Sequence, residues 1–156
     1  MISDATYNIA ESHFSSKSMH VDCLAFSGGR AGAHNRNNVD PRLANNALAT
    51  HVHHGAHHFG PLPQGRYSMT PHESHPLKVR LNPLPGTNTF GRGSFEIHGH
   101  GATGSHGCIV PANPSDLHKI CAAVKSAHAV GKSLVLEVVA IGANIDRKFN
   151  QALYTA

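Results

Sequence analysis

The stretch SFEIHGHGATGSHGCIVP, residues 94–111, carries apolar residues at both ends and a glycine-rich segment between them. At its start, Phe95 and Ile97 alternate with polar residues, which is the pattern of a strand with one face on a core. His98 follows on the polar side. Fifteen glycines and nine prolines divide the whole 156-residue chain into similarly short segments. We therefore expect a mainly β fold.

The same alternation between two strand faces applies at the end of this stretch. If Ile109 enters the core, Cys108 and Val110 point the opposite way, which is also the direction expected for His98. Glycine permits positive φ angles and close backbone approach. We therefore expect the chain to fold back within the glycine-rich segment and to bring His98 beside Cys108.

Six segments of the chain, one of them at the start of this stretch, have strand character. The segments 5–14 and 18–28 are predicted to form an opening hairpin, joined by the polar turn SSKS, and further strands are expected within 60–69, 76–84, 93–101 and 133–141. Residues 28–59 show neither strand nor helix periodicity and are predicted to be a long surface loop.

One segment, 113–131, is predicted to be an amphipathic helix near the C-terminus. Its apolar stripe has the spacing i, i+3, i+4, i+7 and consists of Leu117, Ile120, Cys121 and Val124. Asn113 can cap the helix, Pro114 suits its first position and Gly131 can end it. The expected architecture is a compact β-sandwich or barrel with this single packed helix.

Length and composition limit the function classes. The chain is expected to be one domain, 1–156, with its core at about 5–140 and a short tail at 144–156. The net charge is +4, but the basic residues do not cluster, so nucleic-acid binding is not expected. No apolar run is long enough for a membrane span, and the start lacks the pattern of a signal peptide, so synthesis in the cytoplasm is expected.

A cysteine and a histidine on one face are the minimum for thiol catalysis. His98 would take the thiol proton of Cys108, and the amides of Gly107 and Cys108 could hold an oxyanion. His100 shares the parity of His98 and competes for the base role. His106 is expected to order the turn or the substrate.

Three other residues have two interpretations each. Arg92 could pair with a substrate carboxylate or simply be solvated. Cys23 and Cys121 are expected to pack in a strand and on the helix, while a disulfide between them stays open because sequence alone cannot decide it.

Two rival functions must be weighed. Histidine and cysteine are also zinc ligands, so the cluster at 98–108 or the run HVHHGAHH at 51–58 could serve a zinc-dependent hydrolase. The chain contains neither HExxH nor paired CxxC, so no catalytic metal or other cofactor is expected, although the run could bind metal incidentally. A non-catalytic cell-wall-binding module would need no Cys–His pair.

The segment FEIHGHGATGSHGCIV resembles the signature of the L,D-transpeptidase catalytic domain. A compact branch of that superfamily, the type VI secretion L,D-transpeptidase effectors, has a similarly short spacing between histidine and cysteine. The further elements of that branch have counterparts here in AFSG (25–28), RNN (36–38), GPLPQGRY (60–67) and FGRGSF (90–95). The resemblance covers roughly residues 5–140.

The resemblance implies a mainly β cysteine enzyme, an L,D-transpeptidase or L,D-carboxypeptidase, that acts on the peptide stems of peptidoglycan. Cys108 would form the acyl-enzyme with His98 as base, and Gly107 would belong to the catalytic turn. Substrate contacts are expected from Arg92, Ser105, His106 and His100. It also implies an antibacterial toxin that is made in the cytoplasm, acts in the periplasm of a target cell, and has an immunity protein and a secretion-apparatus component as partners.

Overall fold

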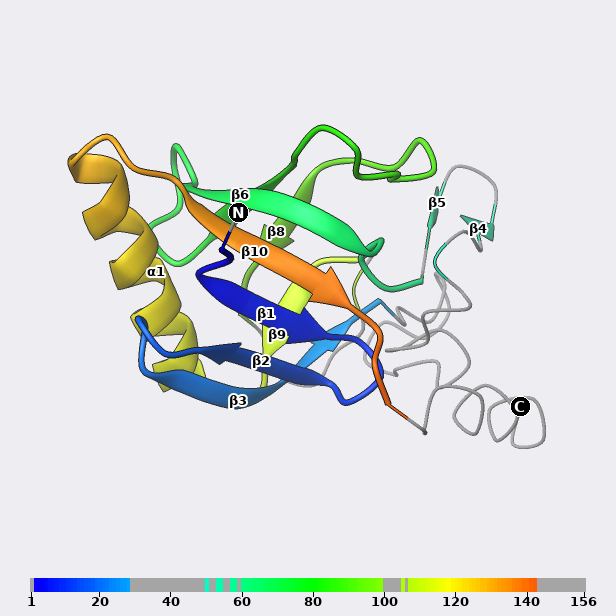
Figure 1. Ribbon diagram of the computed structural model, residues 1–156, viewed down its shortest axis with the longest axis horizontal. Coiled ribbons are helices and arrows are strands. Elements are labelled where there is room, and N and C mark those ends of the chain that lie inside the picture. Colours follow the sequence, from blue (N-terminus) through cyan, green and yellow to red (C-terminus); the bar gives the residue numbers. More distant parts are fainter. Residues whose placement is uncertain are drawn as a thin grey trace.

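The computed structural model describes residues 2–28, Thr50, 53–54, 57–58, 60–99, Ser105 and 107–142. Eight strands of this part form a closed barrel, and one helix packs against its side (Figure 1). The barrel strands are β1 (Ala5–Asn8), β2 (His13–Ser16), β3 (Val21–Ser27), β6 (Gly65–Pro71), β7 (Val79–Pro83), β8 (Phe95–Ile97), β9 (Ile109–Pro111) and β10 (Leu134–Val139). The expected class, mainly β with one packed helix, is confirmed.

The strand order around the barrel is β1-β10-β6-β7-β8-β9-β3-β2, and β2 returns to β1. Two pairs are parallel, β1 with β10 and β8 with β9, and the others are antiparallel. A separate two-stranded sheet joins β4 (His53–His54) and β5 (His57–His58). The rest of the predicted loop at 28–59 lies outside the described residues, apart from Gly28 and Thr50, as does the tail from residue 143.

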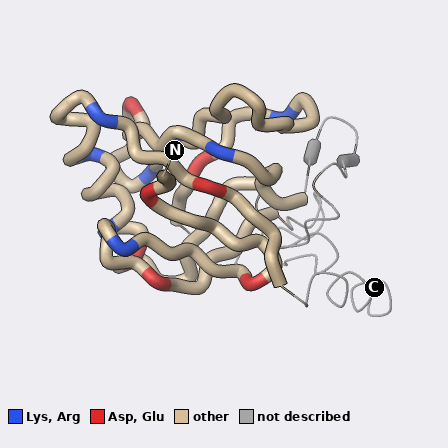
Figure 2. Tube along the Cα trace, viewed as in Figure 1, with Lys and Arg blue, Asp and Glu red and all other residues tan. Residues whose placement is uncertain are grey.

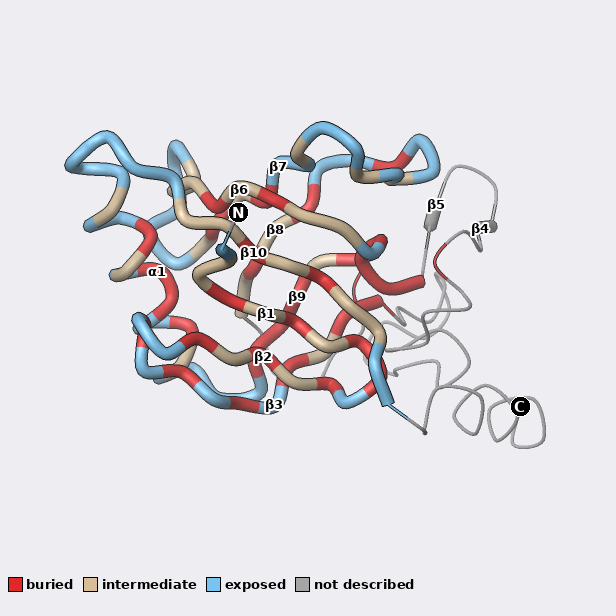
Figure 3. Tube along the Cα trace, in the orientation of Figure 1, coloured by how far each residue is buried: buried red, intermediate tan, exposed pale blue. Residues whose placement is uncertain are grey.

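The core fills the barrel because alternate residues of each strand point inward (Figure 3). In β8, Phe95 and Ile97 are buried while Glu96 is only partly covered, as the sequence alternation predicts. Ile109 of β9 is also fully buried. The buried Tyr7 hydroxyl donates to the Ala25 carbonyl at 3.1 Å, so this large polar ring has a partner inside the core.

The N-terminal segment differs from the predicted two-stranded hairpin. It forms three strands, because the chain already turns after β1, between Asn8 and His13. The side chain of Asn8 accepts from the Ala10 amide at 3.1 Å, and Ser12 adopts a φ of 54°. Asparagine can hold such a turn through its own side chain, which strand alternation does not reveal. The turn predicted at residues 15–18 was placed two residues too early, since β2 runs through Ser16 and the turn to β3 occupies residues 17–20.

Helix α1 (Pro114–Ala129) confirms the predicted helix. Asn113 caps it by accepting from the Ser115 amide at 3.0 Å, and Gly131 follows its end with a φ of 76°. Its buried residues are those of the predicted stripe: Leu117, Ile120, Cys121 and Val124. The stripe holds the helix across β3, β6 and β9, and thus next to the strand that follows Cys108.

Charged residues of both signs are scattered over the described part of the chain (Figure 2). Within that part, no helix has both the length and the apolar composition that crossing a membrane requires.

Candidate active site

The parallel pair β8–β9 positions the predicted catalytic residues. Ile97 pairs with Ile109, and the amide of His98 donates to the carbonyl of Ile109 at 3.1 Å. Both isoleucines enter the core, so Cys108, His98 and Glu96 project from the outer face of the same two strands. In this register Glu96 is the residue beside Cys108, and His98 lies two residues further along the pair.

Two serine hydroxyls clamp the turn that carries Cys108. Ser105 Oγ donates to the Cys108 carbonyl at 2.6 Å and accepts from the amide of Gly28 at 3.0 Å. Ser27 Oγ donates to the Gly107 carbonyl at 2.9 Å. Ser105 is buried, so the structure gives it a role in holding the turn, and Ser27 is a further contributor that sequence reasoning did not single out as a site residue.

Gly107 occupies a position that other residues would not fit. Its φ of 114° is unfavourable for an L-residue with a side chain, and a Cβ atom there would overlap Nη2 of Arg92 and approach the Phe95 ring to 3.1 Å. Its amide donates to Ser105 Oγ at 3.3 Å, so this predicted oxyanion donor already has an acceptor.

Arg92 lies beneath this turn and is buried. Its Nη1 donates to the carbonyls of Thr50 and Pro61, its Nη2 donates to the carbonyl of Gly60, and its guanidinium lies 5.3 Å from the centre of the Phe95 ring. Burial lowers the pKa of Arg92 to about 10, so the side chain stays charged at neutral pH. These contacts favour a role for Arg92 in positioning the turn over direct contact with a substrate carboxylate.

The thiol of Cys108 is partly exposed and protonated at neutral pH. Burial raises its pKa to about 11, a contact with the Glu96 backbone lowers it, and the Glu96 carboxylate raises it again. The positive charges of Lys78 and Arg92 lower the pKa of Cys108. A resting thiolate is therefore not expected, and the thiol would need a base to act as a nucleophile.

His98 is oriented by its backbone. Its Nδ1 lies 2.9 Å from the carbonyl oxygen of Gly99, an atom that only accepts, so Nδ1 donates this hydrogen bond and Nε2 is the nitrogen left for proton transfer. Within the described residues, no hydrogen bond joins the imidazole to the Cys108 sulfur. Catalytic hydrogen bonds often form only when substrate is bound, so this geometry is compatible with a base role.

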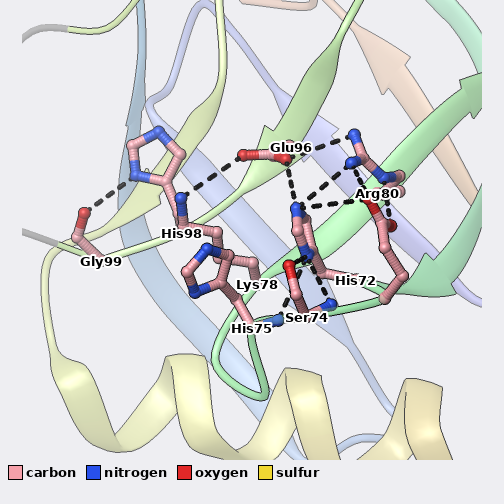
Figure 4. A network of polar contacts seen from close by, with 9 residues as sticks. His72, Ser74, His75, Lys78, Arg80, Glu96, His98 and Gly99 are labelled. Carbon is pink, nitrogen blue, oxygen red and sulfur yellow. Dashed lines mark hydrogen bonds and ion pairs between the residues drawn. The ribbon is translucent and has the colours of Figure 1, made fainter.

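Glu96 is the centre of a polar network that sequence reasoning missed (Figure 4). Its carboxylate oxygens lie 3.3 Å from His72 Nε2, 3.4 Å from Arg80 Nη1 and 4.0 Å from Lys78 Nζ. His72 Nδ1 accepts from the amides of Ser74 and His75, both at 3.1 Å, and its Nε2 also lies 3.2 Å from Nη2 of Arg80. The alternation of β8 places Glu96 outside, but only the fold brings the other residues to it.

The remaining predicted residues are placed as follows. His100, His106 and half of the run at 51–58, namely residues 51, 52, 55 and 56, lie outside the described residues. In the part of the chain that the structure describes, no three His, Cys, Asp or Glu side chains are arranged to hold a metal ion. Cys23 and Cys121 are buried and are not joined by a disulfide.

The chain has no significant match among protein-family models, curated proteins or solved structures.

Proposed function

We propose that the protein is a cysteine acyl-transfer enzyme of the L,D-transpeptidase type, which acts as a transpeptidase or carboxypeptidase on peptidoglycan stem peptides. The register of β8 and β9 carries the proposal: Ile97 pairs with Ile109 and both are buried, so strand alternation puts the adjacent Cys108 and His98 on the opposite, outer side. A thiol and an imidazole in this arrangement are suited to nucleophilic catalysis. The resemblance of residues 94–111 to the L,D-transpeptidase signature supplies the substrate class.

In the proposed reaction, His98 Nε2 takes the proton of the Cys108 thiol as sulfur attacks a peptide carbonyl carbon. The new C–S bond gives a tetrahedral intermediate, whose oxyanion the Cys108 amide stabilises. The C–N bond then breaks, and the leaving amine receives the proton from His98. An acceptor amine or water next attacks the thioester and releases Cys108, which regains its proton.

The protonated resting thiol supports general-base catalysis over a preformed ion pair. Since thiolate is scarce at neutral pH, proton removal must accompany the attack on the carbonyl. The clamp formed by Ser105 and Ser27 supports the same function, because it fixes the backbone on both sides of the nucleophile.

The resemblance extends the proposal to biology: delivery by a type VI secretion apparatus, action in the periplasm of a competitor, and neutralisation by a cognate immunity protein in the producing cell.

The test is to incubate the protein with purified muropeptides and to identify the products by mass. Stem peptides should lose a terminal residue or exchange it for an added amine. Cys108→Ala should lower turnover by at least about a thousandfold, because the nucleophile is removed. Cys23→Ala is the matched control, since it changes a buried thiol in β3 that does not line the cavity beside α1. Turnover by Cys108→Ala comparable to that of the wild type would exclude the mechanism.

A further inference from the structure

A second feature lies beside the Glu96 network. The turn between β6 and β7, together with α1, lines a half-open cavity of about 310 Å³. Its lining includes His72, Glu73, His75, Lys78, Cys121 and Lys125. This volume is at the lower end of the range for ligand cavities, so it suits one residue or end group of a longer ligand.

The charges around this cavity favour an anion. The Glu73 carboxylate is already bound by Arg80, whose Nε donates to it at 2.8 Å and whose Nη2 makes a second contact. Lys125 reaches the cavity from α1 and has no acidic partner within the described residues. Lys78, whose side chain is 36% exposed, has only the long 4.0 Å contact with Glu96. The cavity is therefore lined by two lysines, of which one has a long ion-pair contact and the other has no acidic partner in the described part of the chain.

Lys78 connects the cavity to the candidate active site. It lines the cavity, and its ammonium contacts Glu96, the residue beside Cys108 in the β8–β9 register. Figure 4 shows Lys78 between the His72–His75 turn and the strand that carries Glu96 and His98. A peptide held at the thiol could thus extend one of its groups toward the two lysines.

We propose that this cavity is a substrate subsite in which Lys78 and Lys125 bind a carboxylate of the peptide that reacts at Cys108. The inference rests on the proposed function and names a chemical requirement for its substrate. An ammonium group acts as a compact charge with several donors, so it recognises a carboxylate without demanding a planar, two-point geometry. The substrate would then carry a free carboxylate near the reacting carbonyl. A derivative in which this carboxylate is converted to a carboxamide would bind the protein weakly.

The test measures binding apart from chemistry. Calorimetry on the Cys108→Ala protein would compare a stem tetrapeptide with derivatives in which single carboxylates are converted to carboxamides. One amidation should weaken binding by about tenfold, because a charge-assisted hydrogen bond is lost. Lys78→Met and Lys125→Met should each weaken binding of the unmodified peptide similarly. Neither lysine substitution should further weaken binding of the peptide amidated at that carboxylate, because its amidation has already removed the interaction with the lysines.

Lys132→Met is the control, since this lysine lies beyond α1 and outside the cavity lining. Cys121 provides an independent readout because it lines the cavity. The bound tetrapeptide should slow alkylation of Cys121, whereas the derivative whose amidation weakens binding should not. Equal binding of all the amides, or unchanged affinity in both cavity-lysine variants, would overturn the subsite.

The outcomes separate the two proposals. Muropeptide turnover by the wild type with unchanged affinity in the lysine variants would remove the subsite and leave the proposed function standing. Lysine- and carboxylate-dependent binding without any turnover would support the subsite and remove the acyl-transfer function.

Discussion

Gly107 lies against the buried guanidinium of Arg92, and a Cβ atom on Gly107 would overlap Nη2 of that arginine. Cys108 therefore follows a residue whose lack of a side chain is required by an arginine fifteen positions earlier in the sequence. Arg92 in turn binds carbonyl groups of Thr50, Gly60 and Pro61. The position of Cys108 thus depends on this packed arginine as well as on the strand that follows.

The first prediction tests this packing. Gly107→Ala should destabilise the protein by about 1–3 kcal/mol through its positive φ alone, with more from the overlap with Arg92, and should abolish turnover by displacing Cys108. The measurements are chemical denaturation and muropeptide turnover. Gly86→Ala is the control for backbone strain, because Gly86 has a φ of 92° but no atom within 4 Å of its Cβ position. Near-wild-type turnover by Gly107→Ala would show that the turn tolerates a side chain.

The second prediction concerns the protonation of the nucleophile. The pKa of Cys108 is raised to about 11, so its thiol form is favoured throughout the neutral range. Alkylation of Cys108 should therefore accelerate about tenfold per pH unit from pH 7 and level off only near pH 11.

The rate should be measured by mass spectrometry in a protein carrying Cys23→Ala and Cys121→Ala, because the pKa values of those thiols are also raised to about 11. Glu96→Gln should shift the Cys108 profile toward lower pH, since a negative charge near the thiol is removed. A fast, pH-independent rate above pH 6 would indicate a resting thiolate and contradict this protonation state.

The third prediction separates thiol from metal chemistry. A chelator should leave muropeptide turnover unchanged within about twofold, whereas stoichiometric alkylation of Cys108 should abolish it, because the proposed thiol is activated by His98. Apo and zinc-supplemented protein should be assayed side by side. Activity that is lost on chelation and restored by zinc would favour the zinc-dependent hydrolase instead.

The fourth prediction joins the site to its proposed compartment. Expression in the cytoplasm of a Gram-negative host should be harmless, while the same chain with an added export signal should arrest growth, because the wall substrate is periplasmic. Both Cys108→Ala and His98→Ala should remove the toxicity, and His100→Ala should retain it. Growth curves and the masses of stem peptides from the treated cells are the measurements. If His100→Ala were harmless and His98→Ala toxic, the base assignment would be wrong.

Local features of the chain were predictable from sequence. The helix followed from the stripe that includes Leu117 and Val124 and from its cap at Asn113, because spacing and capping act within a few residues. The outward direction of Glu96 followed from strand alternation in the same way. The additional turn between β1 and β2 was missed, because the bond from the Ala10 amide to the Asn8 side chain leaves no periodic signal.

The candidate site combines features that follow from local sequence with features that depend on tertiary contacts. Sequence by itself determined that the protein is mainly β, that residues 113–131 contain its helix, and that Cys108 and His98 have matching parity, because each depends on neighbouring residues. Only the tertiary structure decided that Glu96 lies beside Cys108, that Arg92 supports Gly107, and that His72 and Lys78 meet Glu96. These contacts depend on the order and register in which the barrel strands pair, and such pairing joins residues whose separation along the chain carries no local pattern.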